Sequence, residues 1–253
     1  MPIREWSSYI RQEIPSDATL IVGMRDVGLV GPISTSHLIK SWELEHVGYL
    51  DSTGLPPVIL FHNAEPLMPM RFYGGYKGNE YVLVLHSDVA VPPQGIRSLA
   101  FYLVKFSTEK KLKRILLLGG IAVQDRLNIE TPKTYAASID REMILYAKEK
   151  GIEPLKEGFV GGIYAQILKE GYKANFPALA LLSECFLNYP DPGASASTLL
   201  ALSKVMGREI DVKPLLEQEE EIRMRLREMM RRTLETMRGT GKEYEYTIPA
   251  LYV

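Results

Sequence analysis

Short apolar segments alternate with longer helix-like segments along most of this chain, and no other feature of the sequence limits the fold more strongly. The strand-like segments are mostly continuous apolar runs rather than alternating patterns, so we expect strands that are buried on both faces. Alternation of this kind is typical of proteins in which helices cover the two faces of a largely parallel or mixed sheet. The sequence therefore predicts an α/β sandwich.

The individual segments are bounded by glycine, proline or aspartate, residues that favour turns. We predict strands over residues 18–22, 45–50, 58–62, 80–86, 114–118 and 178–183. We predict helices over residues 33–40, 93–111, 139–150, 162–170 and 194–206. Asp191, Pro192 and Gly193 precede the last of these helices and Gly207 follows it, as expected for the start and the end of a helix.

The composition changes after Gly207. Glutamates cluster between residues 217 and 221 and arginines between residues 223 and 238, the order of charge that a helix macrodipole favours. Apolar residues recur there at helical spacing, so residues 214–238 predict one amphipathic helix, which packs either on its own domain or between subunits. We therefore divide the chain into an α/β core (1–207), an amphipathic helix (208–238) and a flexible tail (239–253).

The composition also excludes several classes of partner. Lysine plus arginine number 30 and aspartate plus glutamate 31, a net charge of −1, which argues against nucleic-acid binding. No segment approaches the roughly 20 apolar residues of a membrane span, so we expect no membrane association. The single cysteine, Cys185, can form no internal disulfide and anchors no zinc site. We expect a cytoplasmic protein that holds no metal and no cofactor.

Three glycines, Gly23, Gly28 and Gly31, lie between the strand predicted over 18–22 and the helix that follows it. Backbone N–H groups and the helix dipole can receive an anion such as phosphate at that position. Glycine is also required there for steric reasons when the turn is tight. The spacing matches neither a Walker loop nor the Rossmann pattern, so both interpretations stay open. Glu184, at the end of the strand predicted over 178–183, would either face a ligand at the same edge of the sheet or lie in solvent at the end of its strand.

No convergent catalytic set stands out in the sequence. The histidines at positions 37, 46, 62 and 86 lack the short spacing of metal ligands, and no Gly-x-Ser-x-Gly elbow is present. We therefore expect a protein without enzymatic activity. The alternative is a nucleoside phosphorylase or hydrolase, in which residues 23–31 hold phosphate and Glu184 contacts a ribose hydroxyl.

The sequence ends in Leu251-Tyr252-Val253, after a glycine-rich and charged stretch that begins at Gly239. A hydrophobic residue, a penultimate tyrosine and a free carboxylate resemble the HbYX tail of proteasome activators and assembly chaperones. Two further segments add to the resemblance, the glycine loop running into Pro32-Ile33-Ser34 and the stretch Tyr189-Pro190-Asp191-Pro192-Gly193-Ala194-Ser195. Over most of residues 15–221 the chain resembles the proteasome-assembly chaperone family of the second-subunit type.

That resemblance implies a fold and a mode of action. The implied fold is a three-layer sandwich with a mixed, largely parallel sheet, similar to the nucleoside-phosphorylase-like fold but without its chemistry. The implied protein is a homo-oligomer of archaeal type that docks on the α-ring of the proteasome core particle through Leu251, Tyr252 and Val253. Three questions stay open: whether it assists assembly or opens the finished particle, whether a paralogue joins it, and whether it is a plain scaffold whose tail packs on itself.

Overall fold

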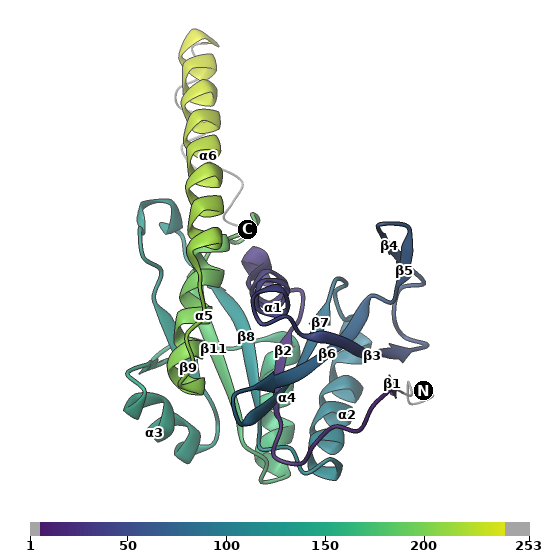
Figure 1. The fold of residues 1–253 in the computed structure, drawn as a ribbon. Coiled ribbons are helices and arrows are strands. Elements are labelled where there is room, and N and C mark those ends of the chain that lie inside the picture. Colours follow the sequence, from purple (N-terminus) through teal and green to yellow (C-terminus); the bar gives the residue numbers. More distant parts are fainter. Residues whose placement is uncertain (1–5, 241–253) are drawn as a thin grey trace.

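A nine-stranded sheet runs through the centre of the computed structural model, which describes residues 6–240 (Figure 1). In spatial order the strands are β1 (Trp6–Ile10), β3 (Glu45–Ser52), β6 (Met70–Lys77), β7 (Glu80–Ser87), β2 (Thr19–Gly23), β8 (Arg114–Ala122), β11 (Ala178–Cys185), β9 (Thr134–Ala137) and β10 (Glu153–Pro154). The four central strands, β7, β2, β8 and β11, are parallel to one another. Antiparallel pairs flank them, β6 with β7 on one side and β9 with β11 on the other. The expected mixed sheet is confirmed.

Helices cover both faces of this sheet. The helices are α1 (Val30–Ser41), α2 (Ile96–Glu109), α3 (Arg141–Glu149), α4 (Gly162–Lys173), α5 (Pro192–Met206) and α6 (Lys213–Thr240), and three 3-10 turns occupy Val27–Leu29, Pro93–Gly95 and Arg126–Asn128. α2 and α4 pack on one face, where the core contains Leu103 and Ile167. α1, α3 and α5 pack on the other face, where it contains Leu38, Met143 and Leu202. The sheet is therefore the middle layer of the three-layer sandwich expected from the sequence.

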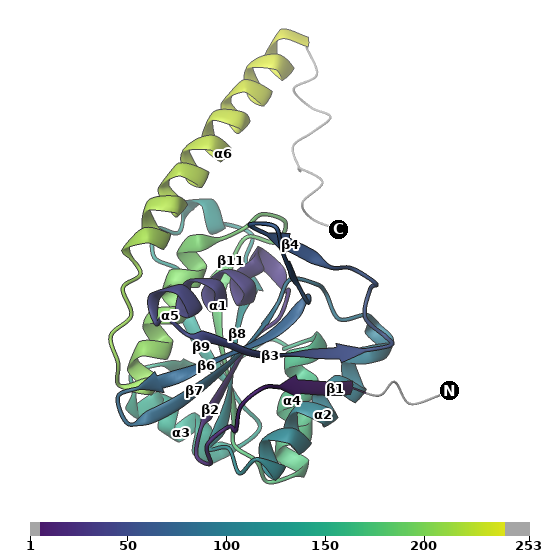
Figure 2. The same ribbon diagram turned by 45° about the vertical axis from the view of Figure 1, so that its right-hand side comes forward.

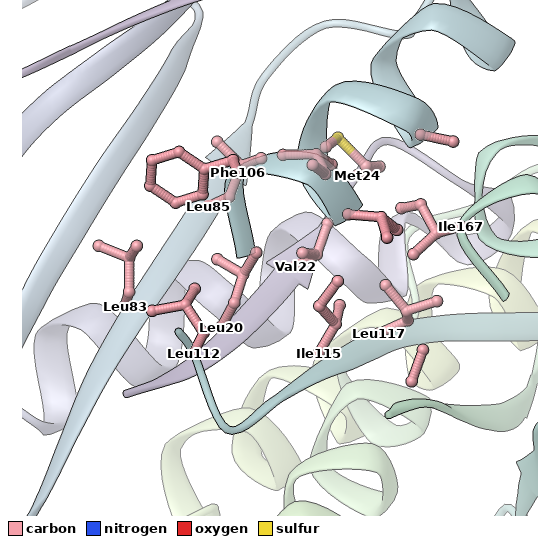
Figure 3. Packing of buried hydrophobic residues seen from close by; sticks show 14 of the residues in the cluster. Leu20, Val22, Met24, Leu83, Leu85, Phe106, Leu112, Ile115, Leu117 and Ile167 are labelled. Atoms are coloured by element: carbon pink, nitrogen blue, oxygen red, sulfur yellow. The ribbon is translucent and has the colours of Figure 1, made fainter. Parts of the chain in front are cut away.

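The continuous apolar run in β2 explains why both faces of the sheet need a cover. Leu20 and Val22 point toward the α2 and α4 layer, as Figure 3 shows, while Ile21 packs among the residues of the α1 layer. All three side chains are fully buried. Burial of each such side chain stabilises the fold by roughly 1.5–3 kcal/mol relative to exposure, so β2 requires helices on either side.

One predicted strand lies elsewhere than the main sheet. Within residues 58–62 only β4 (Leu60–His62) is a strand, and it pairs with β5 (Glu65–Leu67) in a separate two-stranded hairpin. The apolar sequence of residues 58–62 is that of a core strand, but the side chains of Val58, Ile59 and Phe61 are exposed. Met68 and Pro69 connect this hairpin to the main sheet, because β5 ends at Leu67 and β6 begins at Met70.

The two C-terminal helices begin and end close to where the sequence predicts. Asp191 caps α5 by accepting a hydrogen bond from the Ala194 N–H at 2.9 Å, and Gly207 ends it with a left-handed φ of 64°. α6 packs on α5 at its start, where Leu215 is buried. Farther along, α6 extends well beyond the α/β core (Figures 1 and 2).

Candidate functional site

The carboxyl ends of the four parallel strands meet at one edge of the sheet. This edge carries the glycine loop after β2, Gly119 and Gly120 near the end of β8, and Glu184 and Cys185 at the end of β11. Ligands of open α/β proteins bind at such an edge. The structure thus brings together the glycine loop and the end of β11, as expected, and the contacts within this edge decide what it can hold.

The three glycines of the loop lie against neighbouring chain segments. A Cβ atom at Gly31 would lie 2.5 Å from the Met24 carbonyl oxygen, and one at Gly23 would lie 2.5 Å from the Gly31 carbonyl oxygen. Gly28 has a left-handed φ of 64°, and a Cβ atom there would lie 2.9 Å from the Cys185 Cβ. Each position therefore requires glycine for close packing, whatever else the loop binds.

Asp26 supplies a carboxylate inside this loop. Its Oδ1 accepts a hydrogen bond from the Gly31 N–H at 3.0 Å, and its Oδ2 accepts one from the Gly120 N–H at 2.7 Å. These are the backbone donors at the start of α1 and the end of β8 that an anionic ligand would use. Burial raises the pKa of Asp26 to about 7, against the hydrogen bonds from Gly31, Gly120 and its own N–H. The loop thus carries its own carboxyl group on these donors, and this packing favours a structural role over phosphate binding.

Tyr164, on α4, closes the space beneath Asp26. Its hydroxyl accepts a hydrogen bond from the Met24 N–H at 2.9 Å and donates one to the Leu118 carbonyl at 2.5 Å. Burial, and then the charge of Asp26, raise the pKa of Tyr164 well above its ordinary value. A fully hydrogen-bonded tyrosine of this kind holds β2, β8 and α4 together and has no free donor for a substrate.

Glu184 and Cys185 are both engaged by the fold. The Glu184 carboxylate accepts hydrogen bonds from the Lys133 N–H at 2.9 Å and from the Tyr135 hydroxyl at 3.1 Å, so it ties β11 to the neighbouring strand β9. Cys185 is fully buried, and burial raises the pKa of its thiol well above its ordinary value. A buried, protonated thiol is a poor nucleophile, so Cys185 acts as a small core residue.

One group of side chains has the composition of a nucleophilic triad. His86 Nδ1 lies 2.9 Å from the Thr35 hydroxyl, and His86 Nε2 lies 3.3 Å from Asp88. Thr35 is fully buried, however, and its hydroxyl also donates to the Gly31 carbonyl within α1. Arg71 pairs with Asp88 at 2.8 Å. The group therefore links α1 to β6 and β7 and exposes no nucleophile.

Arg126 is the buried charged residue that the sequence did not single out. It is 1% exposed and forms two hydrogen bonds to Asp191, at 2.8 and 2.9 Å, and one to Glu219 at 2.8 Å. It also donates to the Ile129 carbonyl at 2.6 Å and lies 5.1 Å from the ring centre of Phe186. Although burial lowers its pKa, the two carboxylates outweigh that effect and raise it. We name Arg126, Asp191 and Glu219 the arginine clamp.

The arginine clamp joins three parts of the chain. Asp191 caps α5 and donates its N–H to the Gly28 carbonyl at 2.8 Å, so the clamp reaches the glycine loop. Glu219 is on α6 and packs directly against Gly193, where no side chain would fit. Arg223, one turn farther along α6, donates to the Leu127 carbonyl at 2.8 Å. The base of α6 is thereby fixed to the end of the sheet.

A cavity of about 750 Å³ lies beside this base, between α1 and the start of α6. Its lining includes the apolar side chains of Pro32, Ile33 and Leu215 together with polar side chains of α1. His86 and Asp88 also line it. The sequence did not predict this cavity, because its walls come from segments far apart in the chain.

The remaining expectations concern the tail, metals and membranes. Leu251, Tyr252 and Val253 lie outside the described residues, and α6 is the element that leads toward them. Within residues 6–240 no group of three or more His, Cys, Asp or Glu side chains is arranged to hold a metal ion. No helix in that same part of the chain is both long enough and apolar enough to cross a membrane.

Comparison with known proteins gives a consistent result. Residues 20–230 match the model of the PAC2 family. The protein MJ0106 of Methanocaldococcus jannaschii is 30% identical over 217 residues, which are 86% of this chain and 87% of that protein. The crystal structure of PbaA from Pyrococcus furiosus, described as an archaeal homolog of proteasome-assembly chaperone, is 28% identical with a TM-score of 0.78 and covers 94% of this chain and 98% of PbaA. PbaB of the same organism, described as an archaeal proteasome activator, shares the fold at 24% identity with a TM-score of 0.80, covering 89% of this chain and 99% of PbaB.

Proposed function

The chain belongs to the PAC2 family, and from that premise we propose that it is a proteasome-assembly chaperone or activator-like factor. In this proposal it docks on the α-ring of the proteasome core particle through Leu251, Tyr252 and Val253. The observation that carries the proposal is the similarity to PbaA, which extends over nearly the whole of both chains.

The chemistry of the tail supports docking in a pocket. A tyrosine ring offers a large contact area and loses little rotamer entropy, so Tyr252 serves as the anchor. Leu251 fills an adjacent apolar pocket, and the carboxylate of Val253 pairs with a basic side chain. A single short tail binds weakly, so the proposal includes a homo-oligomer, with or without a paralogue, whose several tails reach neighbouring pockets of a ring.

The geometry of α6 supports the same proposal. The helix has 28 residues, which at roughly 1.5 Å per residue gives a length of about 42 Å. The arginine clamp fixes its base, and it extends away from the α/β core (Figure 2). A helix held in this way carries whatever follows it to a defined distance from the core.

We further propose that the protein has no phosphorylase activity. Asp26 occupies the backbone donors that phosphate would need, and Glu184 is bonded to β9. Incubation with nucleosides and phosphate should therefore release no free base, as measured by chromatography. Saturable phosphorolysis that is lost in Glu184→Ala would instead support the enzymatic alternative.

A pull-down of purified core particle tests the docking proposal directly. The full chain should retain core particle, and a variant that lacks the last three residues should not. Equal retention by both would contradict docking through the tail. Hydrogen exchange of the free protein adds a second readout, since slow exchange after residue 240 would favour a scaffold whose tail packs on itself.

A further inference from the structure

A hairpin stands out from the α/β core. Residues 55–69, which we name the arm, contain β4 and β5, and these two strands pair only with each other. Figure 1 shows that the arm and α6 rise from the same end of the core, on opposite sides of α1. A two-stranded hairpin by itself is marginally stable in water. The arm therefore lacks the support that the strands of the nine-stranded sheet give one another.

The arm is also apolar where it is exposed. Val58, Ile59 and Phe61 are 41%, 61% and 72% exposed. Glu65 is the one Asp, Glu, Lys or Arg among its fifteen residues, although such residues make up 24% of the chain. Natural proteins protect an exposed strand edge with charge, and a contiguous apolar surface marks a site of interaction. The arm thus has the chemistry of a buried contact rather than of a solvated loop.

The same chain carries a surface that complements the arm. The lining of the cavity between α1 and α6 includes the apolar side chains of Pro32, Ile33 and Leu215. Its volume of about 750 Å³ lies within the roughly 300–1,000 Å³ of pockets that enclose drug-sized molecules, which is ample for a phenylalanine ring and an adjoining aliphatic side chain. Lys40 is an exposed residue of its lining and complements the single carboxylate of the arm, Glu65. Asp88 and Asp211 also line the cavity, and Asp88 is already paired with Arg71 at 2.8 Å.

We propose that the arm of one copy of this chain docks in the cavity between α1 and α6 of a second copy, with Phe61 in the cavity and Glu65 beside Lys40. The inference rests on the homo-oligomer of the proposed function and names the contact that builds it. Because the arm and the cavity are different surfaces, the contact can repeat from copy to copy as a heterologous contact, and it closes into a ring where the rotation between neighbouring copies closes. Since the arm and α6 rise from the same end of the core (Figures 1 and 2), such a ring carries its α6 helices on one side.

Sedimentation of single variants tests whether the arm builds the oligomer. Phe61→Asp places a charge in the proposed cavity and should convert the oligomer into a monomer near 28.5 kDa at micromolar concentration. Phe101→Asp, at an exposed phenylalanine of α2 on the opposite face of the sheet, should keep the wild-type mass. Circular dichroism should match the wild type in both variants, because both side chains are exposed.

Disulfide cross-linking identifies the surface that receives the arm. Ser36 is an exposed residue of α1 that lines the cavity, and the native Cys185 is buried and does not compete. A mixture of the Phe61→Cys chain with the Ser36→Cys chain should form covalent dimers under mild oxidation. Neither chain alone should form them.

Three results would overturn the inference. They are a monomeric wild-type chain, a Phe61→Asp variant with wild-type mass, and an oligomer that gives no cross-link in the mixture. If Phe61→Asp kept the wild-type mass but lost core particle, the arm would contact the proteasome instead. None of the oligomer measurements uses the proteasome, so a failure of this inference is distinguishable from a failure of the docking proposal.

Discussion

Asp26 is a carboxyl group whose environment opposes its own charge. Both of its oxygens accept backbone N–H groups, which favours the ionised form, but burial has the larger effect and raises its pKa to about 7. In the unfolded chain the pKa returns to its ordinary value of 3.8. Between these two values the folded chain binds more protons than the unfolded chain, so this residue makes stability fall as pH rises.

This difference predicts a specific dependence of stability on pH. The contribution of the protonated carboxyl is fully present below about pH 4 and is lost as pH rises through about 7, at roughly 1.4 kcal/mol for each pH unit between the two values. Asp26→Asn cannot ionise, so the stability of the wild type relative to this variant should fall between about pH 5 and about pH 8. Urea unfolding of both proteins at the two pH values measures this, and identical pH dependence would contradict the raised pKa of Asp26.

The buried guanidinium of Arg126 leads to a second prediction, which concerns the free energy of unfolding. Replacement by methionine keeps much of its volume but leaves Asp191 buried without its cation and leaves Glu219 with only Arg223, at 3.5 Å. Removing one partner of a buried ion pair typically costs about 3–5 kcal/mol. Arg126→Met should lower the free energy of unfolding by that amount, whereas Arg97→Met, at an exposed arginine of α2, should change it by less than about 0.5 kcal/mol. A loss below about 1 kcal/mol in Arg126→Met would show that the buried carboxylates of the arginine clamp do not depend on Arg126 for their stability.

At the scale of elements, the base of α6 should loosen without loss of the fold when Glu219 is removed. Glu219→Ala leaves the two hydrogen bonds between Arg126 and Asp191 intact and removes the bond between Arg126 and α6, while Arg223 can still donate to the Leu127 carbonyl. Amides of residues 213–224 should therefore exchange faster with deuterium, while those of β2 and β8 should keep wild-type protection. Glu217→Ala, at an exposed glutamate of the same helix, is the matched control. Unchanged exchange in Glu219→Ala would mean that packing against α5 and the hydrogen bond from Arg223 to the Leu127 carbonyl hold the helix without Glu219.

The strands that could be predicted from the sequence are those that are buried on both faces of the sheet, because such burial requires a continuous run of apolar residues. β2 and β8 are continuous apolar runs, and the prediction placed both. β1 and β6 were missed because their signals are weak: β1 is an edge strand with alternating burial, and β6 contains Gly74 and Gly75. In the arm a strand was predicted correctly, but β4 pairs with β5 and not with the main sheet. An apolar sequence predicts a strand but does not say which sheet the strand joins.

At the scale of the whole molecule, sites made by distant segments escaped prediction. The cap formed by Asp191 was predictable because its partner, Ala194, is three residues away. Arg126 lies 65 residues from Asp191 and 93 from Glu219, and no local pattern connects them. The ends of parallel strands are an intermediate case, since topology brings Gly28 and Cys185 together once the sheet is known.

The last prediction concerns how the whole assembly binds through its tails, and each variant removes a different physical contribution. Tyr252→Ala removes the aromatic anchor, which typically contributes about 2 kcal/mol or more at each site, so several tails losing it together should abolish measurable binding. One glycine added after Val253 keeps every side chain but moves the carboxylate out of register, so binding should weaken nearly as much. Leu251→Ala should weaken it less, by roughly 1–2 kcal/mol per site. Surface plasmon resonance with purified core particle measures this ranking of affinities, and sedimentation is the control that each variant still assembles. Binding that survives both Tyr252→Ala and the added glycine would exclude docking through the tail.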